Sequence, residues 1–306
     1  MRCPTLGELF LPPGKTGWPW TEESPQLSDT MPDGRPWPQV SVVTPSYNQE
    51  QFVEETIRSV LLQGYPNLEY IIIDGGSIDE SVEIIRKYAD WLAYWVSEPD
   101  RGQTDALNKG FARAHGEIVA WLNSDDTYEP GTLRRVAQEF GEDQARVVIY
   151  GNCNFVDENG SFLDITRTPH VTYNSLIRYW RRNALLAQPA VFFRRKVLEK
   201  VGPLNCDLRF VMDYDLWLRI AREHKFHRIE HTLANYRLHS ESKTNRGWTA
   251  FAPEFDAVSR QHWGPKASWR YICFSLDRSV HLRIGTKLRA VLNWAQQMLC
   301  RENSKP

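Results

Sequence analysis

The sequence predicts an α/β fold built on a mainly parallel β-sheet that is flanked by helices. From Val40 onward, short β-branched segments alternate with segments of helical periodicity, and this alternation is typical of strand–helix–strand crossovers. The 306 residues include 42% hydrophobic and 25% charged side chains, which is ordinary for a globular chain and argues against disorder, collagen and coiled coil. No linker divides residues 39–245, so we expect one large domain there.

Residues 1–38 are dense in proline, glycine and tryptophan, as in Trp18-Pro19-Trp20 and Trp37-Pro38. Proline at this density blocks both helix continuation and sheet pairing. We therefore expect an irregular N-terminal arm. Its tryptophans either pack the arm on its own domain or provide docking points for a partner.

Hydrophobic periodicity assigns the elements of the domain in order. Val40–Thr44 is a β-branched run that predicts the first strand, which Pro45 ends, and residues 50–63 have apolar side chains at helical spacing. Further strands are expected at Leu68–Ile73, Ala93–Val96, Ile118–Leu122, Val147–Tyr150, Ala190–Phe193 and Asn235–Leu238. Further helices are expected at Glu80–Trp91, Thr104–Ala114, Pro130–Phe140 and Asp213–Arg222, and a hairpin turn at residues 158–160.

Charge and cysteine usage limit the function classes. The net charge is -1 and the isoelectric point is near 6.7, which argues against a dedicated nucleic-acid binder. Five cysteines with no close pair favour reduced thiols in a cytoplasmic protein. There is no apolar stretch of about 20 residues that would span a membrane, and no secretory signal pattern begins the chain.

The C-terminal segment, residues 246–306, is expected to be a basic helical extension. The last 51 residues contain nine Lys or Arg and three Asp or Glu. Leucine, valine and alanine side chains fall on one helical face at Leu288, Val291, Leu292, Ala295 and Leu299. A basic amphipathic helix can lie on the inner, anionic face of a membrane or pack on its own domain, and both interpretations remain open here.

Polar clusters follow four of the expected strands. They are Pro45-Ser46-Tyr47-Asn48, Asp74-Gly75-Gly76-Ser77, the segment from Ser97 to Gln103, and Asn123-Ser124-Asp125-Asp126. Each one alone could be a turn or a helix cap. In parallel sheets, however, ligands bind beyond the carboxyl ends of the strands, so four such loops at one edge indicate a binding site.

The acids at this edge suggest a nucleotide diphosphate held through a divalent cation. A carboxylate repels a diphosphate, whereas Mg²⁺ or Mn²⁺ bridges the two through oxygen ligands. Asp125 and Asp126 are the natural anchors for the cation. Arg101 and Lys109 could add positive charge against the phosphates, or they could be ordinary solvated surface residues.

The strand-end motifs resemble, in order, the signatures of family 2 glycosyltransferases. The resemblance rests on residues 40–48, on Ile73-Asp74-Gly75-Gly76-Ser77-Ile78-Asp79 and on Trp121-Leu122-Asn123-Ser124-Asp125-Asp126, and it extends from about Val40 to Thr244. The family implies an inverting enzyme with the GT-A fold, which has a Rossmann-like, mainly parallel sheet and a smaller mixed sheet on the acceptor side.

The resemblance also implies roles on the donor side. Nucleotide-sugar contacts are expected from Pro45, Tyr47, Asn48, Asp74, Gly76, Ser77, Arg101, Lys109, Asn123, Ser124 and Asp125. Within this set, Asp74 accepts from the base, most often uracil, and Asp125 is the principal metal ligand with Asn123 nearer the ribose. The chain departs from the family pattern in two places, since Asn123 and Gly75 replace acids.

On the acceptor side, Asp213 matches the family's catalytic base, although Met212 replaces the preceding glutamate. Without the family, Asp213 could simply cap the helix that it begins. Gln188 and Asp215 are expected near the acceptor, and His239 belongs to a late motif in which a histidine reaches the metal. Together with Asp125 and Asp126, His239 completes the expected metal ligands.

The expected function is metal-dependent transfer of a sugar, most often from a UDP-sugar, to an acceptor hydroxyl. The acceptor would be a saccharide or a lipid-linked saccharide in polysaccharide or glycolipid biosynthesis. Two alternatives remain. A nucleotidyltransferase would share the sheet and the acids, but it favours a glycine-rich, lysine-containing loop after the first strand, where this chain has Pro45-Ser46-Tyr47-Asn48. A non-catalytic nucleotide-sugar-binding module would be consistent with Asn123 and Met212.

Overall fold

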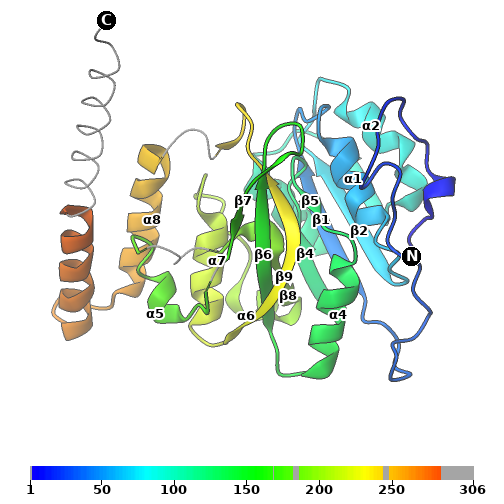
Figure 1. The fold of residues 1–306 in the computed structure, drawn as a ribbon. Coiled ribbons are helices and arrows are strands. Elements are labelled where there is room, and N and C mark those ends of the chain that lie inside the picture. The colour runs from blue at the N-terminus through cyan, green and yellow to red at the C-terminus, as the bar shows by residue number, and fades with distance from the viewer. Residues whose placement is uncertain (1, 168, 182–185, 244–247, 284–306) are drawn as a thin grey trace, which may run out of the picture.

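The computed structural model describes residues 2–167, 169–181, 186–243 and 248–283 (Figure 1). In this part of the chain, nine strands form one sheet in the order β3-β2-β1-β4-β8-β6-β9-β5, and β7 pairs with β6. The strands are β1 (Val40–Ser46), β2 (Leu68–Asp74), β3 (Tyr94–Ser97), β4 (Ile118–Trp121), β5 (Thr127–Tyr128), β6 (Val148–Val156), β7 (Phe162–Thr166), β8 (Val191–Arg194) and β9 (Phe226–Arg237).

The first half of the sheet is parallel, as the sequence predicts. β1 pairs in parallel with both β2 and β4, and β2 pairs in parallel with β3. β8 then lies antiparallel to both β4 and β6, while β6 and β9 are parallel. The carboxyl ends of β1, β2, β3 and β4 consequently meet at one edge of the sheet, which is where ligands bind in such folds.

Helices cover both faces of the sheet because successive strand residues point to opposite sides. Val42 and Ile72 pack in the hydrophobic cluster that includes α1 (Val53–Leu61), α2 (Ser81–Lys87) and α4 (Thr132–Glu142). Val43, Ile71 and Trp121 pack in the cluster that includes α3 (Gln103–Arg113), α7 (Met212–Ala221) and α8 (Trp248–His262). Shorter helices are α5 (Tyr173–Leu176) and α6 (Lys196–Val201), with 3₁₀ turns η1 (Leu6–Glu8), η2 (Ala89–Trp91) and η3 (Gln188–Ala190).

Several element boundaries differ from the expected ones. The helix expected over residues 50–63 is only Val53–Leu61, and the one expected over Glu80–Trp91 divides into α2 and η2. The late strand expected at Asn235–Leu238 is the end of a 12-residue strand that starts at Phe226. The start of β9 escapes detection because its pairing with β6 contains register shifts, which remove the regular alternation of buried and exposed residues.

The N-terminal arm packs on its own domain. Its Trp20 and Trp37 are buried, and Nε1 of Trp18 donates to the carbonyl oxygen of Tyr128 at 2.8 Å. Arg58 of α1, whose side chain is fully buried, donates to three arm carbonyl oxygens, those of Phe10, Pro19 and Trp20. Of the two interpretations of the arm's tryptophans, the structure supports packing against the body.

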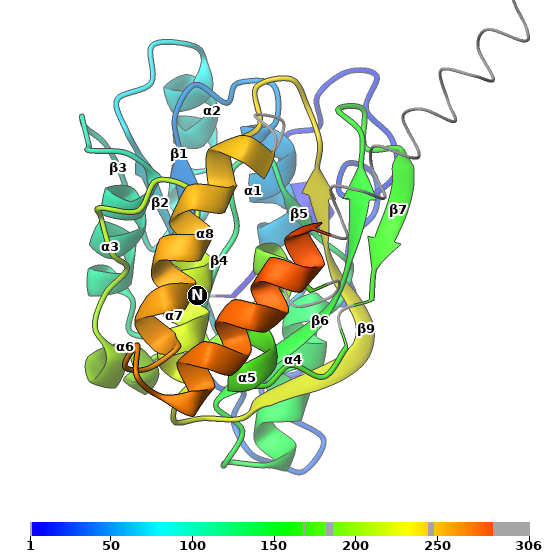
Figure 2. The ribbon, with the colours of Figure 1, turned by 90° about the vertical axis from the view of Figure 1, so that its left-hand side faces the viewer.

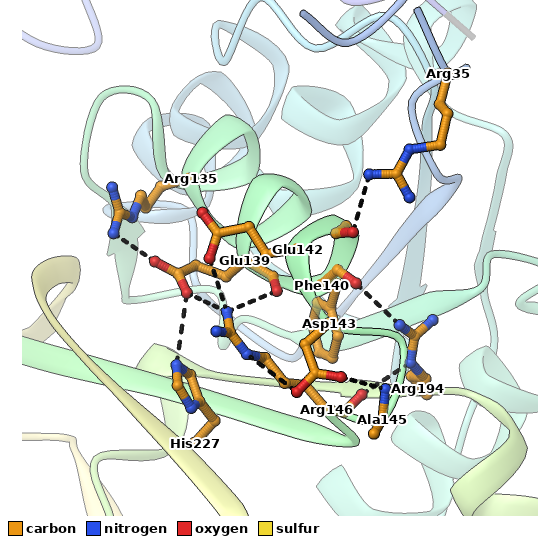
Figure 3. Close-up of polar contacts among 11 residues, drawn as sticks. Arg35, Arg135, Glu139, Phe140, Glu142, Asp143, Ala145, Arg146, Arg194 and His227 are labelled. Carbon is orange, nitrogen blue, oxygen red and sulfur yellow. Dashed lines mark hydrogen bonds and ion pairs between the residues drawn. The ribbon is translucent and has the colours of Figure 1, made fainter. Parts of the chain in front are cut away.

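A network of charges fixes the C-terminal end of α4 (Figure 3). The buried carboxylate of Glu139 is paired with Arg135 and Arg146, and His227 of β9 lies 3.5 Å from it. Arg35 of the arm donates to the carbonyl oxygen of Gly141 at 2.9 Å. The arm, α4 and β9 are therefore held together at the end of the molecule that is remote from the carboxyl ends of β1 to β4.

Two helices close the described part of the chain. α8 is followed by a helix over residues 269–283, and the two lie side by side at the flank of the molecule opposite α2 (Figures 1 and 2). Within the described residues, no helix combines the length and the apolar character that crossing a bilayer requires. The amphipathic face expected at Leu288–Leu299 lies outside the described residues.

Candidate active site

Pro45 lies inside β1, which continues to Ser46 instead of ending at Pro45 as expected, but Pro45 follows the last residue of β1 that pairs with β4 by two positions. Pro45 pairs with Ile73 of β2, whereas the pairing of β1 with β4 covers only Val40 to Val43. The missing N–H of Pro45 therefore costs no ladder bond to β4. The side chain of Tyr47 is exposed, and Asn48 adopts a left-handed backbone with φ of 51°. The left-handed backbone at Asn48 turns the chain after β1, and the ring of Tyr47 is exposed at the carboxyl end of this strand.

Asp74, at the end of β2, organises the neighbouring loop. Its fully buried carboxylate accepts from the backbone N–H of Gly76 and Ser77, and from the hydroxyls of Ser77 and Ser97. Asn48 is locked to the same loop, since its N–H donates to Ser77 Oγ and its Oδ1 accepts from Ile78. Gly76 has a φ of 82°, which favours glycine. All the hydrogen bonds described for Asp74 stabilise these loops; its contact with a base stays a prediction.

The surroundings of Gly75 explain why glycine replaces the acid of the family pattern at this position. A Cβ atom at this position would lie 2.8 Å from Oδ2 of Asp100, which belongs to the loop after β3. That carboxylate also accepts from the N–H of Gly102 at 2.7 Å. The space beside Gly75 is therefore filled by an acid from a different loop, so that Asp100 lies next to the Asp74 loop.

Asn123, after β4, is the centre of an amide network. Its Oδ1 accepts from Nε2 of Gln103 at 2.6 Å, and its Nδ2 lies 3.2 Å from Oε1 of Gln188. Gln188 is buried and donates to the carbonyl oxygen of Trp121 at 2.7 Å. Neighbouring Ser124 is also buried. The structure thus brings the expected donor-side Asn123 and the expected acceptor-side Gln188 into contact.

Asp125 and His239 form a close pair at the same edge. Oδ2 of Asp125 lies 3.0 Å from Nε2 of His239, and the histidine ring packs against Phe52 with centroids 4.6 Å apart. A carboxylate oxygen and an imidazole nitrogen are suitable donors for Mn²⁺, so the pair fits part of a cation site. Within the described ranges, no group of three or more His, Cys, Asp or Glu is arranged to hold a metal ion.

Asp126 lies behind this pair and has a different environment. Its buried carboxylate accepts from the backbone N–H of Arg237 at 3.0 Å and from Nδ2 of Asn123 at 3.1 Å. Burial, together with the adjacent charge of Asp125, raises the pKa of Asp126 well above its ordinary value. The Asp126 bonds described here hold the backbone of β9; its role as a metal ligand stays a prediction.

Arg237 fixes the loop that carries Asp125. Its guanidinium, which is almost completely buried, donates from Nε to the carbonyl oxygen of Asp125 at 2.9 Å and from Nη1 to that of Glu158 at 3.0 Å. Nη2 lies 3.0 Å from the carboxylate of Glu55 in α1. One side chain therefore joins the β4 loop, the β6–β7 turn and α1.

Asp213 lies in the first turn of α7, whose N-cap is Val211. Burial raises the pKa of Asp213 to about 6, and the positive charge of Lys243 acts in the opposite direction. Lys243 also donates from Nζ to Oε1 of Gln103 at 2.7 Å. Because Gln103 bonds to Asn123, Lys243 connects the candidate base with the donor-side loop.

Three expected site residues have other partners. Arg101 pairs with Asp105 in an exposed ion pair, and Lys109 pairs with Glu98. Asp215 is buried and pairs with Arg219, which in turn donates to the carbonyl oxygens of residues 201–203. These contacts support the loops around the site, and contacts of the three residues with substrates stay predictions.

A cleft of about 280 Å³ lies beside the Asp125–His239 pair. It is bounded by the loop of residues 48–52, by Asp79, by Glu158 of the β6–β7 turn and by residues 239–241. His239 is the residue that the cleft shares with the pair. The pair therefore lies next to an opening at the strand ends rather than being sealed in the core.

Sequence reasoning did not find Asp100, Gln103, Arg237 and Lys243 as site residues. Asp100 and Gln103 flank Arg101-Gly102 in a polar loop that the sequence does single out, so their position after the third strand was the available signal. Arg237 stands two residues before His239 in a segment of high polarity. For Lys243 no signal was available, because the hydrogen bonds described for it join it to Gln103 and Arg209, which are 140 and 34 positions away.

Comparisons with known proteins identify the family. The sequence profile of glycosyl transferase family 2 matches residues 41–202. An uncharacterized glycosyltransferase of Rickettsia conorii is 31% identical over 218 residues, which cover 68% of this chain and 35% of the relative. The putative teichuronic acid biosynthesis glycosyltransferase TuaG of Bacillus subtilis is 28% identical over 248 residues, 78% of this chain and 95% of TuaG. The chain spans between 31% and 66% of the length of the five Rickettsia relatives that it matches.

Solved structures share the fold. TarS of S. aureus, residues 1–349 in complex with UDP-GlcNAc, has a TM-score of 0.58 and 19% identity, with 69% of this chain and 61% of that chain covered. The mannosyltransferase PcManGT of Pyrobaculum calidifontis, in complex with GDP-Man and Mn²⁺, has a TM-score of 0.56 and 19% identity, with 89% and 83% covered. The likeness confirms the expected GT-A fold. By its matched sequence profile and its fold, this chain belongs to glycosyl transferase family 2.

Proposed function

We propose that the chain is an inverting glycosyltransferase, which moves a sugar from a nucleotide-diphosphate sugar to an acceptor hydroxyl. The observation that carries the proposal is the connection Asn123–Gln103–Lys243, because the charge of Lys243 acts electrostatically on Asp213. It joins the loop after β4, where a donor would bind, to the first turn of α7, where the candidate base lies. A donor and an acceptor that occupied these two places would be neighbours.

Asp213 is the general base in this proposal. Its carboxylate removes the proton of the acceptor hydroxyl, and the oxygen attacks the anomeric carbon from the face opposite the departing diphosphate. The carbon–oxygen bond to the diphosphate breaks, so the configuration inverts and the diphosphate leaves with the bonding electrons. A pKa of about 6 suits this role, because the group is charged near neutral pH and still basic enough to take a proton.

Asp125 and His239 hold a divalent cation in this proposal, Mn²⁺ or Mg²⁺. Their donor atoms lie 3.0 Å apart at the edge where the diphosphate is expected, and the structural relative PcManGT was solved with Mn²⁺. When bound, such a cation stabilises the negative charge of the leaving diphosphate. Lys243 adds a positive charge from the protein itself, and it donates to the Gln103 amide that also binds Asn123.

A UDP-sugar is the proposed donor, and a saccharide or lipid-linked saccharide the acceptor. The support comes from similar proteins: TarS was solved in complex with UDP-GlcNAc, and TuaG is a putative teichuronic acid biosynthesis glycosyltransferase. A GDP-sugar is the alternative donor to test, because PcManGT was solved with GDP-Man. We place the reaction in polysaccharide or glycolipid biosynthesis in the cytoplasm.

The experiment measures donor binding first and turnover second. UDP-, GDP- and dTDP-sugars are compared by the rise in unfolding temperature with and without Mn²⁺, since a ligand that binds the native state raises its stability. Donors that bind are then incubated with saccharide acceptors, and the phosphate product is identified. Release of the nucleoside diphosphate together with a glycosylated acceptor supports transfer, pyrophosphate indicates a nucleotidyltransferase, and binding without either product indicates a binding module.

A further inference from the structure

The helix over residues 269–283 is anchored to the body along one side. Phe274 is buried, and the guanidinium of Arg178 lies 4.3 Å from its ring centroid. Asp277 accepts from Nε1 of Trp180 at 3.1 Å and pairs with Arg181 at 2.7 Å. These contacts fix which side of the helix faces the domain.

The opposite side of this helix carries an exposed apolar stripe. We define the outer stripe as Trp269, Ile272, Leu276 and Val280, whose spacing of three and four residues places them on one helical face. Their exposed fractions are 77%, 40%, 62% and 51%. This helix is the outermost layer of its flank, as Figures 1 and 2 show. Contiguous exposed apolar surface of this kind marks an interaction site.

The charge around the outer stripe is positive. Lys266 and Arg283 are exposed, whereas Arg270 is turned towards the body, where it donates to Asn174 and lies over the ring of Phe274. The one acid in residues 263–283 is Asp277, and it is paired on the inner side with Arg178 and Arg181. The surface that surrounds the stripe therefore presents cations and no exposed carboxylate from this segment.

We propose that the outer stripe docks the protein on the surface of an anionic phospholipid membrane. An apolar face with tryptophan at its end and basic residues at its margins is the pattern of helices that lie in the membrane interface. Anionic headgroups complement Lys266 and Arg283. A second copy of the chain would bring the same positive margins together, so self-association through this stripe is disfavoured.

The docking surface is distinct from the face that the sequence suggested at Leu288–Leu299, and the proposal does not depend on the proposed catalytic function. The proposal identifies residues 269–283 as the contact, and it requires the membrane to accept both the apolar side chains and the positive charges.

The test is sedimentation of the full chain with extruded vesicles of phosphatidylcholine alone, or with about a third phosphatidylglycerol. We expect binding to the anionic vesicles, weakened by added salt because the charges are screened. The triple variant Trp269→Ser, Leu276→Ser, Val280→Ser should lower the partition coefficient about tenfold or more, since three apolar side chains no longer leave water. The double variant Lys266→Glu, Arg283→Glu should lower it for anionic vesicles.

A matched control replaces exposed apolar residues elsewhere. Phe162→Ser with Leu163→Ser changes β7, where both side chains are exposed, and should leave vesicle binding unchanged. Circular dichroism and thermal unfolding check that each variant is folded. Absence of binding, equal binding to both kinds of vesicle, or unchanged binding of the triple variant would overturn the proposal. A dimer that the triple variant makes monomeric would assign the stripe to a second copy instead.

Discussion

Nε of Arg237 donates to the carbonyl oxygen of Asp125 across 2.9 Å, and the backbone N–H of the same arginine donates to the carboxylate of Asp126. One residue of β9 thus holds both consecutive acids of the β4 loop. The candidate cation ligand Asp125 owes its position to a side chain 112 positions away.

Replacing Arg237 with alanine should destabilise the fold strongly. The substitution leaves the carbonyl oxygens of Asp125 and Glu158 and the carboxylate of Glu55 without their shared donor. Removing one partner of a buried ion pair typically costs about 3–5 kcal/mol, and urea unfolding measures the loss. The control Arg86→Ala removes a pair with Glu83 in which both side chains are exposed and should cost about 1 kcal/mol or less. Equal effects of the two substitutions would show that Arg237 is not a structural centre.

Replacing Asp125 with asparagine should weaken Mn²⁺ binding, and so should His239→Gln. Both donors lie at one place, 3.0 Å apart. Loss of a residue that only orients a metal ligand typically lowers affinity about 10–100-fold, so loss of either proposed ligand should lower it at least as much. Titration of Mn²⁺ in the presence of UDP, followed by electron paramagnetic resonance, measures the affinity without turnover. Asp143→Asn, which changes an exposed acid directly after α4, is the control. Unchanged Mn²⁺ affinity in both variants would exclude the pair as a cation site.

Replacing Asp213 with asparagine should abolish most transfer and leave donor binding intact. General-base catalysis is typically worth about 10²–10⁴-fold, so kcat should decrease by that factor. The dissociation constant of the donor should stay within about twofold, because the described contacts of Asp213 are with α7 and with the charge of Lys243 rather than with the donor loops. A variant that turns over at the normal rate would remove Asp213 from the mechanism.

The raised pKa of Asp213 has consequences for both activity and stability. Transfer needs the carboxylate form, so kcat/KM should increase as the pH rises through about 6. The folded protein binds this proton more tightly than the unfolded chain, whose pKa is near 3.8. The contribution of Asp213 to stability is therefore complete below about pH 4 and is lost as the pH rises through about 6. Urea unfolding between pH 4 and 7 should show this loss in the wild type and not in Asp213→Asn.

Replacing Lys243 with alanine should shift the acid limb of the pH–rate profile to higher pH. The positive charge of Lys243 lowers the pKa of Asp213, and its removal leaves the effect of burial unopposed. Lys243→Arg retains the charge and should retain the position of the limb. A loss of turnover in Lys243→Ala with no shift of the limb would show that Lys243 acts on the donor side alone.

Local sequence patterns were sufficient for the parallel half of the sheet. Val40–Thr44 and Leu68–Ile73 are β-branched or apolar runs, as expected for strands that are buried on both faces. Only Ser41 and Glu69 interrupt these runs, and the two buried side chains hydrogen-bond to each other. The second half of the sheet was harder to predict. β8 and β9 pair with strands that are distant in the sequence, and their direction depends on tertiary packing rather than on local pattern.

The candidate site was predicted at the level of loops and not of contacts. Parallel strands put the loops that contain Asp74 and Asp125 at one edge, and this follows from topology alone. The sequence did not indicate that Asp126 faces inward or that Asp74 accepts from four local donors. Burial and hydrogen-bond partners depend on side-chain packing between distant segments, and adjacent acids such as Asp125 and Asp126 are indistinguishable until that packing is known.

Arg58 joins the N-terminal arm to α1, and this contact bears on protein engineering. A shortened version that starts at the first strand would expose a guanidinium that is now buried, and it would remove all three carbonyl acceptors at once. The residues before Val40 are therefore a part of the folding unit rather than a dispensable leader. Purification tags belong ahead of the arm and not in its place.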